Sequence, residues 1–193
     1  MIAAMLLAAA QADSPAEPLQ PDCSYDLDAM LALDQNSFDQ DMNGGWRPLG
    51  QIDGCEEATA ELIRAWRHEK RNHASILYWH EGQMRAYAGQ TKEAIALFGR
   101  TYAAPEHDGN FGWNYYVSGT IAFLNGDREG LTRAIEGLST IPEPEDNSFT
   151  RPDGTVFEMS WPPNMNVLRG FEECWGKPYK EAYGSGCTKP LVM

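Results

Sequence analysis

Apolar side chains recur at helical spacing along most of the chain, which predicts a helical protein. One helix is predicted over residues 25–41, where the apolar positions are Leu27, Met30, Leu31, Leu33 and Phe38. A second is predicted over residues 55–71, which begin with acidic residues and end with basic ones, an order that complements the helix dipole. Glycine and proline in residues 43–54 predict a break between the two helices.

The pattern from residue 75 onwards repeats after 37 residues. The repeat aligns Tyr78 with Tyr115, Gly82 with Gly119, Gly89 with Gly126, and Pro105 with Pro142. A residue as small as Gly82 lets a second helix approach closely, and Gly89 can take the positive φ of a tight turn that ends a helix. Each unit is therefore predicted to be a pair of antiparallel helices, closed by a proline, that must stack on its neighbours to bury its apolar faces.

Residues 75–105 resemble the tetratricopeptide repeat (TPR) through Tyr78, Gly82, Gly89, Ala94, Phe98 and Pro105. Residues 112–142 are similar, but carry Leu131 and Ile135 where the family has an alanine and an aromatic residue. Weaker units flank these two, in residues 25–66 and 166–183. The resemblance implies an all-α fold of about three to four stacked antiparallel helical hairpins, with residues 25–193 forming one TPR-like domain.

Residues 143–163 interrupt the repeats. Residues typical of strands surround Pro152, Asp153 and Gly154, which together are a turn signal. We interpret the segment as a short β-hairpin near residues 148–159, with an irregular loop as the alternative.

The first twelve residues are apolar, small and uncharged, and they end in Ala10-Gln11-Ala12, the form that signal peptidase reads. Residues 1–12 are therefore expected to be a cleaved export signal, followed by a flexible linker over residues 13–24. The segment lacks the basic residue expected before the apolar run, and a frayed N-terminal helix is the alternative.

Four cysteines, Cys23, Cys55, Cys174 and Cys187, form no C-x-x-C motif. An even number of cysteines in an exported chain predicts two disulfides, and four cysteines allow three pairings. We favour Cys23–Cys55 and Cys174–Cys187, which would place one link at each end of the domain. The expected location is the periplasm or the extracellular medium.

The formal net charge is −13. An acidic surface of this size argues against binding to nucleic acid or to anionic membranes. It favours a basic partner, although solubility alone also explains it. No membrane insertion is expected after signal cleavage.

His80-Glu81 begins like the zinc-protease helix H-E-x-x-H, but Met84 stands where the second histidine ligand is required. No phosphate loop, dinucleotide fingerprint or nucleophile elbow is present. Carboxylate pairs suited to a hydrolase occur at Glu172-Glu173 and at Asp26 with Asp28, but acids are abundant in this chain and these are more simply surface charges. We therefore expect no catalytic activity, cofactor or metal site.

The TPR resemblance implies a concave face, built by the first helix of each unit, that holds an extended partner segment. The positions carried over are Trp79, His80, Gln83 and Tyr87 in the first unit and Trp113, Tyr116 and Thr120 in the second. Aromatic residues with polar ends suit a binding face because they give a large contact area at low entropic cost. Packing between helices is the alternative for the two tryptophans.

The function expected from the sequence is an exported TPR-like protein-binding module or adaptor that holds a partner protein segment on its concave helical face. The alternative is a secreted inhibitor or immunity protein that binds a basic toxin or enzyme.

Overall fold

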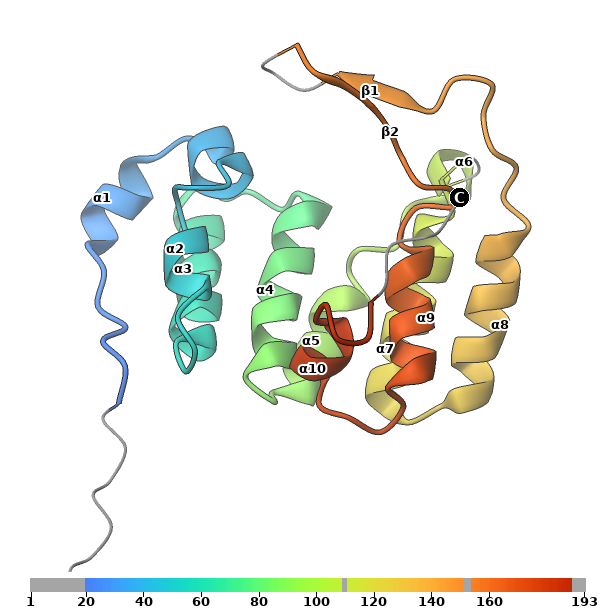
Figure 1. Cartoon of the computed structure of the whole chain (residues 1–193). Helices are drawn as coiled ribbons and strands as arrows, with labels where there is room; N and C mark the ends of the chain where they lie inside the picture. The colour runs from blue at the N-terminus through green and yellow to red at the C-terminus, as the bar shows by residue number, and fades with distance from the viewer. Residues whose placement is uncertain (1–19, 109–110, 151–153, 189–193) are drawn as a thin grey trace, which may run out of the picture.

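A computed structural model describes residues 20–108, 111–150 and 154–188 (Figure 1). The protein is mostly helical, as predicted, and these described residues include one small sheet. The expected signal segment, residues 1–12, and residues 13–19 of the expected linker lie outside the described residues. The elements are α1 (Leu27–Ala32), the π-helix η1 (Asn36–Gln40), α2 (Arg47–Gly50), α3 (Glu56–Glu69), α4 (Ser75–Tyr87), α5 (Thr91–Phe98), α6 (Pro105–Asp108), α7 (Trp113–Asn125), α8 (Arg128–Ser139), β1 (Ser148–Thr150), β2 (Val156–Glu158), α9 (Met165–Glu173) and α10 (Tyr179–Tyr183).

The helix predicted over residues 25–41 is broken, so that prediction is wrong. α1 ends at Ala32, because the next residue, Leu33, has an extended backbone. The carbonyl oxygen of Leu33 accepts a hydrogen bond from Trp66 Nε1 at 3.3 Å. The side chain of Asp34 then accepts a bond from the Ser37 main-chain N–H at 2.8 Å, which begins the π-helix η1. The second predicted helix is present as α3, with its acidic start and basic end.

Two helical hairpins, α4–α5 and α7–α8, lie at the centre of the chain. Gly89 and Gly126 end their first helices with φ values of 75° and 68°, as predicted. A methyl group at Gly82 would lie 2.8 Å from Phe98 Cε1, and one at Gly119 would lie 2.6 Å from Leu168 Cδ2. Both glycines therefore stand where helices approach closely, which confirms their predicted role.

The proline-closed end of the first unit differs from the prediction. α5 ends at Phe98, well before Pro105, and residues 99–104 are not helical. Pro105 instead begins the single turn α6. Proline suits a first helical position because its fixed φ matches the helix and its missing N–H would have no intrahelical partner there.

The β-hairpin predicted near residues 148–159 is present. β1 pairs with β2 antiparallel, with Ser148 opposite Glu158 and Thr150 opposite Val156. Figure 1 shows these strands standing away from the helices.

The helices bury two apolar clusters that meet at α4. One gathers side chains from η1, α2, α3 and α4, among them Phe38 and Trp66, whose rings stack 4.7 Å apart. The other gathers side chains from α4, α5 and α7–α10, including Phe98, Phe123 and Phe171. α4 contributes Leu77 and Met84 to the first cluster and Trp79 and Ala86 to the second, so it is covered on both sides.

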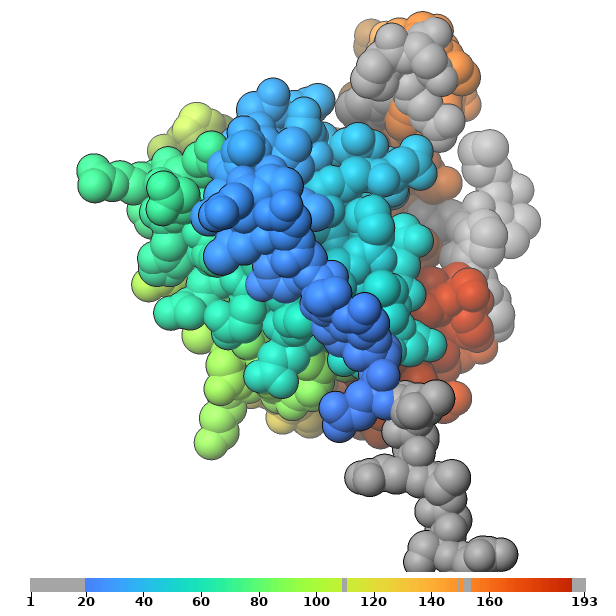
Figure 2. Space-filling view, turned by 90° about the vertical axis from the view of Figure 1, so that its left-hand side faces the viewer, coloured from blue at the N-terminus to red at the C-terminus, as the bar shows by residue number. Residues whose placement is uncertain are grey.

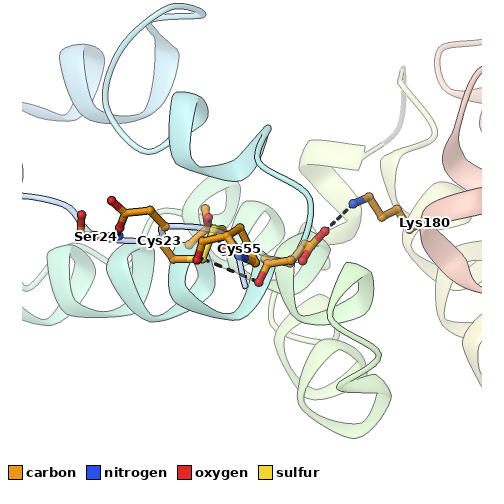
Figure 3. Close-up of a disulfide and its surroundings, with 9 residues drawn as sticks. Cys23, Ser24, Cys55 and Lys180 are labelled. Carbon is orange, nitrogen blue, oxygen red and sulfur yellow. Dashed lines mark hydrogen bonds and ion pairs between the residues drawn. A yellow bond between two sulfur atoms is a disulfide. The ribbon is translucent and has the colours of Figure 1, made fainter. Parts of the chain in front are cut away.

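Both favoured disulfides, Cys23–Cys55 and Cys174–Cys187, are present, and the described residues contain no free cysteine. Such links are typical of an oxidising, extracytoplasmic environment. Figure 3 shows Cys23 and Cys55 with Lys180 reaching toward the same region; Lys180 Nζ lies 2.6 Å from Asp53 Oδ1 and also pairs with Glu56. The C-terminal helix α10 is thereby joined to the start of α3. None of the described helices is long and apolar enough to cross a membrane.

We predict that Gly82→Leu and Gly119→Leu each lower the free energy of unfolding by about 1–3 kcal/mol or more, because the new side chain overpacks a helix contact. Urea denaturation measures the change. Gly186→Ala is the matched control, since a methyl group there meets nothing within 4 Å. Unchanged stability in both leucine variants would contradict the packing.

We also predict that protein purified without reductant has no reactive thiol when denatured, as counted with a chromogenic thiol reagent. Replacing both cysteines of either pair by serine should cost about 2–4 kcal/mol of stability, because the unfolded chain gains freedom. Two or more free thiols before reduction would contradict the pairing.

Candidate functional site

Four of the seven residues predicted to bind a partner are buried. Trp79, Gln83, Tyr116 and Thr120 are each less than one-tenth exposed, so they cannot contact a partner in this structure. The other three, His80, Tyr87 and Trp113, are partly buried and occupied by contacts within the chain. The predicted concave site is therefore not an open surface.

The C-terminal helix α10 covers this face. Its Tyr179 and Tyr183 rings lie 5.6 and 6.0 Å from the ring of Tyr87 on α4. Burial raises the pKa of Tyr116 well above its usual range, and interactions with Tyr183 and Tyr179 raise it further. The chain thus places its own C-terminal segment where the TPR resemblance implied a partner.

The two tryptophans form part of the core, as the alternative interpretation held. Trp79 packs against Trp113 and Tyr116, with each pair of ring centroids 4.8 Å apart. Trp113 Nε1 donates a hydrogen bond of 2.7 Å to the Thr101 carbonyl oxygen. The aromatic rings join α4 to α7 and hold the segment that follows α5.

Two buried hydroxyl groups have no hydrogen-bond partner among the described residues, Thr120 Oγ1 and the Tyr179 hydroxyl. Burial raises the pKa of Tyr179 well above its usual range. The nearby amide of Gln83 acts to lower the pKa of Tyr179, although no hydrogen bond of normal geometry joins the two side chains. Both hydroxyl groups belong to helices of the covered face, α7 and α10.

His80 is held by Asp39, a fully buried residue of η1. His80 Nδ1 lies 2.6 Å from Asp39 Oδ1, and Trp46 Nε1 donates to the same oxygen at 3.0 Å. Burial by itself would raise the pKa of Asp39, but the interaction with His80 and the hydrogen bonds from Trp46 and Gln40 hold it below its usual value. This pair could not be predicted from the sequence pattern, because its members are 41 residues apart.

The next residue, Glu81, forms a buried ion pair with Arg67 of α3. Arg67 Nε and Nη2 lie 2.9 and 2.5 Å from Glu81 Oε2, and the guanidinium stands 4.0 Å from the centroid of the Tyr78 ring. His80 and Glu81 are thus used in separate structural contacts. Within the part of the chain that the structure describes, no group of three His, Cys, Asp or Glu residues is placed to hold a metal ion.

The open aromatic surface lies elsewhere, around Tyr102. Two pockets of about 370 and 390 Å³ adjoin, and Tyr102 lines both. We call this pair of pockets the Tyr102 groove. One pocket lies along α7 and α8, with Tyr115, Ile121 and Arg133; the other lies near the starts of α4 and α7, with Ile76, Phe111 and Trp113.

Large aromatic side chains are exposed in the Tyr102 groove. Tyr102, Phe111 and Tyr115 are 46%, 37% and 38% exposed. The hydroxyl of Tyr102 lies 3.1 Å from that of Ser118, and the side chain of Asn114 bonds both the N–H and the carbonyl oxygen of Ala103, at 2.8 and 2.9 Å. The groove is therefore fixed to α7 and presents aromatic area that no described residue covers.

The repeat explains why this surface is open. Tyr78 is buried between the guanidinium groups of Arg67 and Arg100, 4.0 and 5.3 Å from its ring centroid. Thirty-seven residues further on, Tyr115 has Ala104 and Gly137 at the equivalent places. A methyl group at Gly137 would lie 2.2 Å from Tyr115 Cε1, so the ring lies against α8 and, without the two guanidinium groups, remains 38% exposed.

A third pocket, of about 370 Å³, lies at the turns that close the helical hairpins. Its lining includes Gly89, Gly126 and Gly176 with the aromatic residues Tyr87, Phe123, Trp175 and Tyr179. Arg128 lies over the Trp175 ring, 5.7 Å from its centroid. We assign no function to this pocket.

Comparison of the chain with family models, with curated proteins and with solved structures finds no match. The likeness to TPR units therefore depends on the residues of the repeat itself.

We predict that acid destabilises the protein below about pH 4, in part through Asp39. Because the folded-state pKa of Asp39 lies below its usual value of 3.8, ionised Asp39 stabilises the fold above that value, and the contribution is lost as the pH falls through the folded-state pKa. Asp39→Asn should cost about 1–3 kcal/mol at pH 7 and make the loss on acidification smaller. Urea denaturation between pH 7 and pH 3 measures both, with the exposed Asp28→Asn as control; equal acid sensitivity in all three proteins would contradict the role of Asp39.

Proposed function

We propose that this protein is an exported, TPR-like binding protein that holds a segment of a partner protein in the Tyr102 groove. The observation that carries the proposal is the exposure of three aromatic side chains around two adjoining pockets. Exposed aromatic groups that line pockets are typical anchors of protein interfaces. The two disulfides support export to the periplasm or the medium.

The proposal moves the binding surface from the concave face to the Tyr102 groove. The concave face is filled by α10, which is tied down by Cys174–Cys187 and by the ion pairs of Lys180. In the Tyr102 groove the pockets are open to an incoming side chain. A partner segment with one apolar side chain on each side of Tyr102 would bury the exposed rings.

Each pocket has room for an apolar side chain of a partner, and a partner segment would bury the exposed rings of Tyr102, Phe111 and Tyr115 around them. A binding role also accounts for the rigid support of the groove, because an interface that is already ordered loses less entropy when it binds. An adaptor and an inhibitor would both use such a surface. The net charge of −13 favours a basic partner in either case.

We predict that a photo-reactive amino acid at Tyr102 or Tyr115 cross-links the partner in cells of the source organism, whereas the same amino acid at Leu27 does not. Leu27 is similarly exposed, at 41%, but lies on α1. Once the partner is identified, Tyr102→Ser/Tyr115→Ser should weaken its binding by about 2 kcal/mol or more, roughly 30-fold.

Leu27→Ser serves as the matched control for affinity, and thermal melting checks that each variant remains folded. Normal binding by a folded tyrosine variant, or equal cross-linking from Leu27, would contradict the proposal.

A further inference from the structure

Besides the Tyr102 groove, the β-hairpin and the segments that flank it are exposed to solvent, and we call this part of the molecule the β-arm. It consists of β1 and β2 with the segments 141–147 and 159–161 that lead to and from them. Figure 1 shows it rising beside the helices, and Figure 2 shows it as a separate lobe. All three residues of β2 are exposed, Val156 by 62%.

The base of the β-arm is firmly held. The Asn147 carbonyl oxygen accepts a bond from the Met159 N–H at 3.2 Å, and Asn147 Nδ2 donates to the Met159 carbonyl oxygen at the same distance. Trp161 Nε1 donates to the Ile141 carbonyl oxygen at 3.0 Å. The arm is therefore positioned at its base, while Ser148, Thr150 and the residues of β2 are exposed.

A two-stranded hairpin with no further strand beside it has two open edges. Isolated hairpins are marginally stable in water, and each strand leaves one row of main-chain N–H and C=O groups without a strand beside it. In the described residues the sheet has only these two strands. Its open edges can pair with an extended segment of another protein, a common mode of peptide recognition.

The charge of the β-arm specifies that segment. Residues 143–158 contain five acidic residues and one arginine. Glu143, Glu145, Asp146 and Glu158 are exposed, and none of them forms an ion pair with a described lysine or arginine. An extended partner with basic side chains would neutralise this charge, whereas an acidic one would be repelled.

The β-arm is also continuous with the Tyr102 groove. Trp161, at the base of the arm, meets the ring of Phe111 edge-on, with 6.3 Å between centroids. Phe111 in turn lines one pocket of the groove. A segment that leaves the groove at Phe111 therefore comes directly to the base of the arm.

We infer that the β-arm is a docking element for an extended basic segment of the partner protein, which lies along an open strand edge with its cationic side chains among the exposed acids. This inference deepens the proposed function by naming the chemistry of the partner. It assigns the apolar anchors to the groove and the basic, strand-forming part of the partner to the arm.

The test uses a short capped peptide of alternating lysine and valine, with a counterpart in which glutamate replaces lysine. Titration into the protein is followed by NMR and by calorimetry. We expect the lysine peptide to shift resonances of residues 143–159 and the glutamate peptide to leave them unchanged. Affinity for the lysine peptide should fall about tenfold or more between low salt and about 0.5 M salt, because screening weakens charge pairing.

Two matched variants distinguish the arm from the general acidity of the protein. Glu143→Gln/Glu145→Gln/Glu158→Gln should weaken binding of the lysine peptide about fivefold or more. Glu57→Gln/Glu69→Gln/Glu93→Gln removes the same charge from exposed sites on the helices and should change affinity by less than about twofold. Equal weakening in both variants, or no binding of the lysine peptide, would overturn the inference.

The groove variant Tyr102→Ser/Tyr115→Ser separates this inference from the proposed function. If the peptide still binds the groove variant but no longer binds the arm variant, the arm inference is supported, whether or not Tyr102 cross-links a partner. Peptide binding that is lost in the groove variant and kept in the arm variant places the basic segment in the groove. That result would overturn the arm inference and leave the proposed function standing.

Discussion

The burial of α4 on both sides is the constraint on which the arrangement of the other helices depends. An unpaired charge in such an interior costs several kcal/mol, so each charged group of α4 needs a partner from a neighbouring element. Arg67 of α3 pairs with Glu81, and Glu61 of α3 pairs with Arg85. The buried carboxylate of Asp39 in η1 is in turn held by the ring of His80. These pairs set how α3 and η1 lie against α4, and they use the two residues that suggested a metal-binding helix.

The C-terminal helix α10 also packs against α4. α10 brings Tyr179 and Tyr183 against Tyr87, while Lys180 reaches the acidic groups at the start of α3. The Cys174–Cys187 disulfide closes this segment on α9. A face that the TPR resemblance assigns to a partner is thereby occupied by α10, which joins α4 to the start of α3.

The early end of α5 opens that other surface. Because α5 stops at Phe98, a non-helical segment, residues 99–104, follows it and carries Tyr102. Tyr102 and Tyr115 lie exposed, whereas Tyr78 in the preceding unit is covered. The β-arm rises from the same region through Trp161. The exposed rings of the Tyr102 groove and the exposed acids of the β-arm thus lie on neighbouring parts of the molecule, and the proposed partner would have an apolar part and a basic part.

The sequence by itself determined the helical class and the glycine positions, because these depend on local spacing and on the conformational freedom of single residues. It favoured the β-hairpin and the disulfide pairing that the structure has, but left an irregular loop and other pairings open. It placed Gly82 and Gly119 at close contacts because only a small residue fits there, whatever else surrounds it. Only the tertiary structure decided which faces are open. The repeat aligned Tyr78 with Tyr115, and the TPR resemblance marked Tyr116 as accessible, but exposure depends on which distant segment covers a side chain. Arg67 and Arg100 cover Tyr78, whereas Tyr115 has no equivalent cover. Tyr116 is buried, and α10 approaches it.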